Sequence, residues 1–267
     1  MPLAVCATPI GNLEDVTLRV LRELAGADLV LCEDTRRTRI LLDRHGIVAR
    51  TLSYHEHNEA ARTAALLPRL LAGERVALVS DAGLPGVNDP GARLIAAALE
   101  AGVPVTVLPG ASAVETALVA SGYAGDQYRF LGYLPRAAGA LASVWEELAR
   151  WPHPAVAFES PRRLPATLRS LATALPGRPV AVCRELTKAF EEVVRGRAVE
   201  VATRFPEPPK GEITLVLGPG ELTGPDEGAA VAAVTELVAA GVPRRQAADV
   251  VARLTGAARN RLYRGSL

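Results

Sequence analysis

The sequence has few aromatic residues and no long apolar run. Aromatic side chains make up 4% of its 267 residues, which argues against a base-stacking platform of the kind that single-strand-binding proteins use. No apolar run reaches the ~18 residues that a membrane-spanning helix needs, and no signal-peptide pattern opens the chain. We therefore expect a protein that does not insert into a membrane.

Cysteine and lysine are also scarce. Cys6, Cys32 and Cys183 each end an apolar, strand-like run, and their spacing fits no zinc site. We expect them in the core of a protein from a reducing, cytoplasmic compartment. Of 30 Lys and Arg residues, only Lys188 and Lys210 are lysines. A lysine kept among arginines suggests a phosphate contact or an adjustable pKa, with chance as the alternative.

The first 120 residues alternate strand-like and helix-like segments, which predicts a mostly parallel sheet covered on both faces. The expected strands are Leu3–Ala7, Leu29–Cys32, Thr51–Ser53, Val76–Val79 and Val105–Leu108. The expected helices are Thr17–Leu24, Arg37–His45, Asn58–Ala72, Pro90–Ala101 and Ser112–Ser121.

A second α/β unit should follow, because Gly122–Arg136 interrupts this rhythm with glycines and a proline. Its expected strands are Ala155–Phe158, Val180–Cys183, Glu192–Arg195 and Ile213–Leu217, and its expected helices are Leu141–Ala149 and Leu164–Ala174. A loop over Gly218–Gly228 should close the unit. We therefore predict an α/β protein with domains at 1–121 and 122–220 and a helical, basic C-terminal extension at 229–267.

The most informative segment is VALVSDAGLPGVNDPG, from Val76 to Gly91. A buried strand ends in a loop rich in glycine, and such loops at the carboxyl ends of strands bind ligands in open α/β sheets. Asp81 can accept a hydrogen bond from a ribose or an amine. We expect Asp89 to cap the next helix, with Pro90 at its first position. The loop is not a Walker phosphate-binding loop, because no Gly-Lys-Ser/Thr follows, and it does not contain the GxGxxG motif of dinucleotide-binding folds.

Three further segments follow other strands. In ATPIGNLED, Asp15 or Thr17 should cap a helix, although an ordinary turn is the simpler interpretation. PGASA opens a helix with small residues, which permits a close ligand, and Ser112 should cap it.

CEDTRRTRILL places carboxylates beside Arg36, Arg37 and Arg39. This mixture suits an anionic substrate beside a proton acceptor, or alternatively a salt-bridged helix start.

Two other motifs are candidate binding sites. YHEHNE (Tyr54–Glu59) lacks a third ligand at metal-site spacing, so we expect a polar loop and no metal. At the C-terminus, two short helices joined through Thr255-Gly256 carry arginines. These can bind a phosphate backbone, with a solvated basic tail as the alternative.

Together these motifs resemble the ribosomal RNA small subunit methyltransferase I family of the tetrapyrrole methylase superfamily. The resemblance rests on six motifs that occur in this order: ATPIGNLED, EDTRRT, SYHEHNE, SDAGLPGVNDPG, PGASA and FESPRRL. Two later segments, CRELTKAFEEVVRG and KGEITLVLG, also match the family. It implies two α/β domains with S-adenosyl-L-methionine in the cleft between them, and a homodimer. It also implies 2′-O-methylation of a cytidine in 16S rRNA of the small ribosomal subunit. The implied cofactor contacts are Pro9, Asp81, Gly83, Val87, Ser112, Ala113, Phe158, Leu186, Glu212 and Ile213.

Methyl transfer to a ribose hydroxyl needs a group that helps the proton leave. From motif position, the hypothesis is that Asp34 or Lys210 does this, while Arg36 and Arg37 orient phosphate. The alternatives are a related methyltransferase acting on a tetrapyrrole or a protein side chain, and a non-catalytic ribosome-binding factor. A nucleotide-binding oxidoreductase is disfavoured because the Rossmann fingerprint is missing.

Overall fold

The computed structural model describes residues 2–220 and 227–267. Its contacts divide the chain into two units: Met1–Trp145 with His153–Pro219, and Glu146–Pro152 with Gly220–Leu267. The loop predicted over Gly218–Gly228 lies partly outside the described residues.

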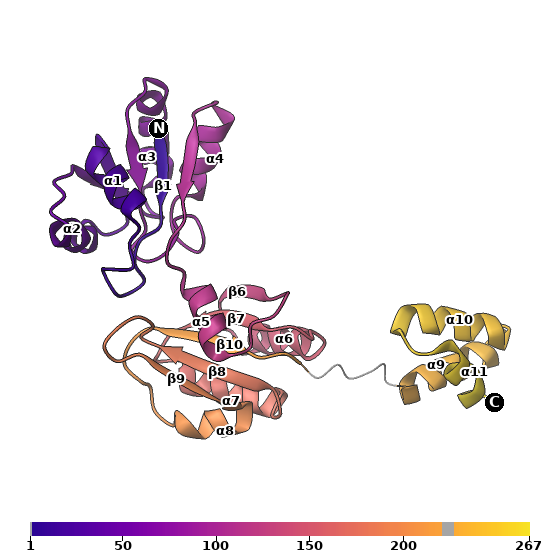
Figure 1. The fold of residues 1–267 in the computed structure, drawn as a ribbon. Coiled ribbons are helices and arrows are strands. Elements are labelled where there is room, and N and C mark those ends of the chain that lie inside the picture. The colour runs from indigo at the N-terminus through magenta and orange to yellow at the C-terminus, as the bar shows by residue number, and fades with distance from the viewer. Residues whose placement is uncertain (1, 221–226) are drawn as a thin grey trace. The chain divides into compact units, whose positions relative to one another are not determined.

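The first sheet contains five parallel strands in the order β3-β2-β4-β1-β5. The strands are β1 (Leu3–Cys6), β2 (Leu29–Cys32), β3 (Thr51–Ser53), β4 (Val76–Leu78) and β5 (Val105–Leu108). Between them lie α1 (Leu18–Gly26), α2 (Thr35–Arg44), α3 (Glu59–Leu71) and α4 (Ala92–Glu100) (Figure 1). The predicted βα alternation and parallel sheet are confirmed.

Helices cover both faces of this sheet, because successive side chains of each strand point to opposite faces. Leu3 and Val5 of β1 pack with side chains of α3 and α4. Ala4 and Cys6 pack with side chains of α1 and α2 on the other face. The connections after the neighbouring strands β1 and β4 therefore leave toward opposite faces. In open α/β sheets, such a point opens a ligand-binding crevice at the carboxyl ends of the strands.

The second sheet is mixed, in the order β6-β7-β10-β8-β9, with only the β6–β7 pair parallel. Its strands are β6 (Arg129–Tyr133), β7 (Ala155–Glu159), β8 (Pro179–Arg184), β9 (Glu192–Arg197) and β10 (Ile213–Leu217). Its helices are α6 (Ala138–Ala149), α7 (Leu164–Ala174) and α8 (Ala198–Arg204).

Helix α5 (Ala113–Ser121) follows β5 in the chain but packs on the second sheet. Its Val114 and Leu118 share a buried cluster with Val156, Ala181 and Val216. Packing therefore groups α5 with the second sheet, whereas the sequence groups residues up to 121 with the first. The chain therefore passes from the first sheet to the second between β5 and α5.

Two elements differ from the sequence predictions. The segment predicted as a domain boundary, Gly122–Arg136, contains β6, whose pairing with β7 is irregular between Phe130 and Tyr133. Gly132 there has φ of +65°, so the alternating pattern of a strand is broken. Helix α8 was not predicted, because its residues AVEVATR include three β-branched side chains, which favour strands.

Three predicted helix caps can be compared with the structure. Of the two candidates Asp15 and Thr17, Thr17 caps α1 by accepting a hydrogen bond from the Val20 N–H at 3.2 Å. The prediction that Asp89 caps the following helix was wrong: α4 begins at Ala92, after Gly91 with φ of +134°. Ser112 occupies the N-cap position of α5, but its hydroxyl bonds the Glu115 carboxylate and makes no backbone cap.

Cys6, Cys32 and Cys183 are all buried, as the sequence predicts. Burial raises the pKa of Cys6 and of Cys183 to about 12. Both thiols therefore stay protonated and behave as core residues.

The C-terminal region forms three helices, α9 (Glu227–Ala239), α10 (Arg244–Thr255) and α11 (Arg259–Gly265). Val234, Ala248 and Leu262 are fully buried in their common core. Gly256, with φ of +74°, ends α10, which confirms the predicted pair of helices joined through Thr255-Gly256. Among the described residues, no helix combines the length and apolarity needed to cross a membrane.

Candidate active site

The loops after β1 and β4 are joined at the carboxyl edge of the first sheet. The Thr8 N–H donates to the Gly83 carbonyl at 2.8 Å, and the Gly83 N–H donates to the Thr8 carbonyl at 3.1 Å. The Thr8 hydroxyl also donates to the Ser80 carbonyl at 3.0 Å. Gly83 has φ of +80°, a conformation that glycine adopts without strain. The glycine loop is therefore fixed against the ATPIGNLED segment.

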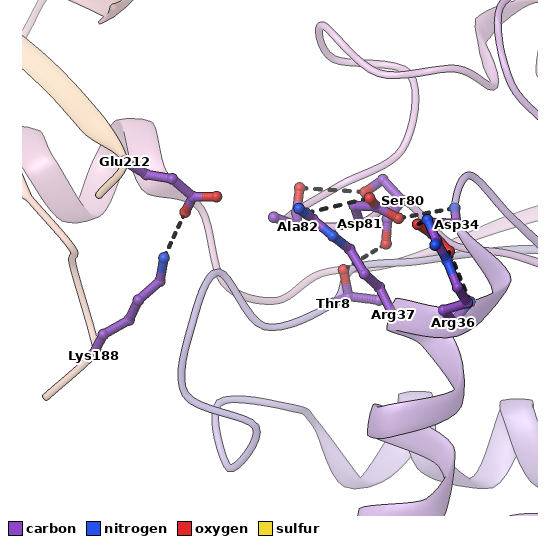
Figure 2. Close-up of polar contacts among 9 residues, drawn as sticks. All are labelled: Thr8, Asp34, Arg36, Arg37, Ser80, Asp81, Ala82, Lys188 and Glu212. Atoms are coloured by element: carbon purple, nitrogen blue, oxygen red, sulfur yellow. Dashed lines mark hydrogen bonds and ion pairs between the residues drawn. The ribbon is translucent and has the colours of Figure 1, made fainter. Parts of the chain in front are cut away.

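Asp81 ties the same loop to the start of α2. Its Oδ1 accepts the backbone N–H of Asp34 at 3.0 Å, and its Oδ2 lies 3.3 Å from Nη1 of Arg37. The Asp81 side chain is 19% exposed and that of Arg37 is 61% exposed. Figure 2 shows these side chains together. The loops after β1, β2 and β4 thus meet at one edge, as the sequence predicts.

Asp34 is bound mainly to its own helix. Its Oδ1 accepts the Arg36 N–H at 2.8 Å, and its Oδ2 lies 2.7 Å from Nη2 of Arg36. The hydrogen bonds from Arg36 hold the pKa of Asp34 well below its usual range, which makes this carboxylate a weak proton acceptor. Arg36 itself is 88% exposed.

A large pocket of about 760 Å³ lies beside these loops. It is lined by the glycine loop, the start of α5, and residues of β6, β7, β8 and β10 with the loops beside them. Three aromatic side chains form one wall: the ring centroids of Phe130 and Tyr133 lie 5.1 and 5.5 Å from that of Phe158, in edge-to-face geometry. We call this the larger pocket.

Carboxyl groups line the larger pocket, among them those of Asp89 and Glu115. Glu115 accepts hydrogen bonds from Ser112 and, at 2.6 Å, from the Tyr128 hydroxyl. Burial opposes the ionisation of Glu115, but these hydrogen bonds lower its pKa overall. Asp89 behaves differently, because burial and the nearby charge of Glu33 raise its pKa to about 6. The pocket therefore combines apolar walls with carboxyl groups of different acidity.

A second, smaller pocket of about 280 Å³ lies next to the first and shares Ile10, Ala82 and Glu212 with it. Its other walls come from the loop after β1, from α2, from the glycine loop and from Lys188. We call this the smaller pocket.

Lys188 is held between two carboxylates. Its Nζ lies 2.8 Å from Oε1 of Glu185 and 2.8 Å from Oε2 of Glu212. Burial lowers the pKa of Lys188, but the two carboxylates outweigh burial and raise the pKa above its ordinary value. Figure 2 shows the Lys188 ammonium reaching Glu212. This group is therefore a charged hydrogen-bond donor at neutral pH.

The structure distributes the predicted site residues between these pockets and the surface. Eight of the expected cofactor contacts line the larger pocket: Gly83, Val87, Ser112, Ala113, Phe158, Leu186, Glu212 and Ile213. Pro9 and Asp81 line the smaller pocket, as does Arg37. Asp34, Arg36 and Lys210 line neither, and the Lys210 side chain is exposed.

Sequence reasoning singled out Lys188 but did not place it in the site. It also gave no role to Tyr128, Phe130 and Tyr133, which line the larger pocket. A signal was present: three of the five tyrosines cluster in GYAGDQYRFLGYLPR, where aromatic residues are otherwise scarce.

The YHEHNE segment forms a polar loop, as expected. The Nε2 of His55 lies 3.0 Å from the Asn58 amide nitrogen, and its buried Nδ1 finds no hydrogen-bond partner among the residues that the structure describes. His57 and Glu56 are exposed, and Nε2 of His57 lies 3.4 Å from Oε1 of Glu56. Within residues 2–220 and 227–267, no cluster of three metal-ligating side chains occurs.

Two known sequence families match this chain. The family described as Tetrapyrrole (Corrin/Porphyrin) Methylases matches residues 2–202, and the RsmI C-terminal HTH domain matches residues 225–265. A protein of Mesorhizobium japonicum named "Ribosomal RNA small subunit methyltransferase I" is 45% identical over 265 residues, 98% of this chain and 90% of that protein. The chain belongs to this methyltransferase family.

A second relative and two solved structures are also similar to this chain. A Micromonospora olivasterospora protein of the same name is 44% identical over 98% of this chain and 85% of its own length. The structure of the methyltransferase CobJ has a TM-score of 0.63 at 22% identity, covering 81% of this chain and 93% of CobJ. A uroporphyrin-III C-methyl transferase from Thermus thermophilus, solved with S-adenyl homocysteine, has a TM-score of 0.56 at 21% identity. The match covers 81% of this chain and 96% of that protein. These two structural likenesses establish the tetrapyrrole methylase fold.

Proposed function

We propose that this protein transfers a methyl group from S-adenosyl-L-methionine to the 2′-hydroxyl of a cytidine in 16S rRNA of the small ribosomal subunit, as a homodimer. The observation that carries the proposal is the 45% identity, over nearly the whole chain, to a protein named as a ribosomal RNA small subunit methyltransferase. Identity at this level extends to the C-terminal helices, which the tetrapyrrole methylase family match at residues 2–202 does not include.

The larger pocket fits the cofactor. Its volume of about 760 Å³ lies within the ~300–1,000 Å³ range of small-molecule sites. Small side chains at the start of α5 and the bare backbone of Gly83 permit a close approach. Phe158 offers an apolar face for a ring, and the carboxylate of Glu115 suits the positive charges of a sulfonium and an ammonium.

The chain's residues contribute mainly by alignment. S-adenosyl-L-methionine, when bound, supplies a methyl group on a positively charged sulfur. The walls of the larger pocket hold that group, and the smaller pocket orients the acceptor hydroxyl beside it. Positioning of this kind can supply about 7–11 kcal/mol of a barrier. Asp34 and Lys210, which the sequence suggests for removing the hydroxyl proton, line neither pocket, so we expect alignment to contribute more than either of them.

The C-terminal helices supply charge for the RNA. Residues 241–267 contain six arginines and one aspartate. The described side chains of Arg245, Arg253 and Arg264 are exposed, while Arg259 pairs with Asp249. Phosphate contacts by arginine position a protein on nucleic acid without reading its sequence. We assign this role to α10 and α11.

The test is the transfer of labelled methyl from S-adenosyl-L-methionine to small ribosomal subunits that lack the native methylation. Free 16S rRNA and a tetrapyrrole precursor serve as alternative acceptors, and nuclease mapping identifies the product. We expect label in a 2′-O-methylcytidine of the subunit. Label in the tetrapyrrole would contradict the proposal, and the absence of cofactor binding with intact RNA binding would favour a non-catalytic ribosome-binding factor. Light scattering tests the homodimer.

A further inference from the structure

Lys188 is the cation of the smaller pocket whose position is most strongly fixed. Its side chain is 28% exposed, and two of its three N–H groups point to Glu185 and Glu212. An ammonium has three donors and no acceptor. The described residues therefore leave one N–H of Lys188 for a ligand in the pocket that it lines.

The segment that carries Lys188 is strained. Glu185 has φ of +51° and Thr187 has φ of +65°, and a β-branched residue rarely adopts such a conformation. Strain of this sort concentrates at functional sites. The backbone thus accepts an unfavourable conformation on both sides of Leu186, directly before Lys188.

The same segment presses against the loop after β1. The Asn12 N–H donates to the Thr187 hydroxyl at 3.0 Å. A Cβ added to Gly11 would lie 2.6 Å from Cγ of Lys188 and 2.9 Å from the carbonyl oxygen of Leu186. Only glycine permits this approach, so the close fit fixes the lysine at the edge of the crevice.

The smaller pocket has the chemistry of a sugar-phosphate site. Arg37 and Lys188 supply positive charge, and Asp81 and Glu212 supply acceptors for hydroxyl groups. Its volume of about 280 Å³ is below the ~300–1,000 Å³ typical of pockets for whole drug-sized ligands. It adjoins the larger pocket through Glu212 and two neighbouring residues. A group in the smaller pocket is thus placed next to a cofactor in the larger one.

We propose that Lys188 is a positioning residue for the acceptor, whose ammonium donates a hydrogen bond to a ribose or phosphate oxygen of the nucleotide in the smaller pocket. This inference rests on the proposed methylation of rRNA. It assigns to Lys188 the role of fixing the acceptor and leaves binding of S-adenosyl-L-methionine to the larger pocket.

The experiment compares Lys188→Met and Lys188→Arg with the wild-type protein and with Arg169→Met, which removes an exposed cation on α7 that lines neither pocket. Methyl transfer to small subunits gives kcat and KM, calorimetry gives the Kd of S-adenosyl-L-methionine, and thermal unfolding reports folding. Loss of a hydrogen bond from a charged group predicts that Lys188→Met lowers kcat/KM for the subunit by about 10- to 100-fold. Lys188→Arg, which keeps the charge and donors, should recover part of this loss.

The Kd of S-adenosyl-L-methionine decides between positioning and a general structural role. We expect Lys188→Met to leave it within about twofold of the wild-type value. If Lys188→Met lost as much affinity for S-adenosyl-L-methionine as it loses in kcat/KM, the inference would be overturned. A kcat/KM of Lys188→Met equal to that of Arg169→Met would also overturn it. A wild-type protein that binds the cofactor but methylates no RNA would overturn the proposed function, and the inference with it.

Discussion

The larger and smaller pockets are neighbours that share three residues, but their walls differ in chemistry. The larger pocket presents aromatic and small apolar side chains, including Phe130 and Phe158. The smaller pocket presents paired charges, with Arg37 beside Asp81 and Lys188 beside Glu212. An adenosyl group suits the first environment and a ribose-phosphate suits the second. The difference indicates that one crevice is divided between a cofactor and an acceptor.

The largest expected effect comes from filling the larger pocket with Gly83→Val, with Gly102→Val as the matched control. Both glycines have positive φ, +80° and +74°, so both variants should lose about 1–3 kcal/mol of stability through strain. A Cβ at Gly83 meets the Ala111 carbonyl oxygen at 3.7 Å, whereas a Cβ at Gly102 meets open space.

We therefore expect Gly83→Val alone to weaken binding of S-adenosyl-L-methionine, by about 100-fold, or ~2.7 kcal/mol. Calorimetry measures the affinity, and thermal unfolding checks that the two variants lose similar stability. Equal affinity in both variants would show that the cofactor does not occupy the larger pocket.

An intermediate effect is expected from Asp89→Asn, which sharpens the electrostatic description of the larger pocket. Because the folded-state pKa of Asp89 is raised from 3.8 to about 6, its contribution to stability is fully present below pH ~4 and is lost as the pH rises through ~6. Asparagine removes that loss. Urea unfolding should show the variant more stable than the wild type by about 1–3 kcal/mol at pH 7.5, and no such gain at pH 4. A gain independent of pH would contradict the assignment.

The smallest effects are expected outside both pockets, from Asp34→Asn and Lys210→Met. A residue that assists proton transfer contributes about 10²- to 10⁴-fold to the rate. Asp34 is engaged with Arg36, and Lys210 is exposed, so we expect kcat of each variant to stay within about tenfold of the wild-type value. Single-turnover methyl transfer measures this step. A loss of 100-fold or more in either variant would restore the sequence hypothesis for that residue.

Much of the site could be predicted from the sequence because its parts follow strands. Thr8, Asp34 and Asp81 come after β1, β2 and β4, and the carboxyl ends of parallel strands meet at one edge. Chain order alone therefore brings these loops together. The apolar runs predicted the buried cysteines, and residue type made Thr17 one of the two candidate caps of the first helix.

The remainder depends on packing that chain order does not specify. Lys188 and Lys210 each follow or precede a strand of the second sheet, and nothing in the sequence shows which one lines a pocket. The antiparallel pairing of β8 with β10 places Arg184 opposite Ile213, which brings the segment after β8 beside Glu212. Similarly, α5 follows the first sheet in sequence but packs on the second, and Gly132 interrupts β6.

The most direct test of the division between the pockets is a crystal structure of the protein with S-adenosylhomocysteine. We predict that the ligand occupies the larger pocket against Gly83, Ala113 and Ile213, with its sulfur facing the residues shared with the smaller pocket. The smaller pocket, with Lys188, should stay open for an acceptor. S-adenosylhomocysteine seated between Arg37 and Lys188 would contradict the account.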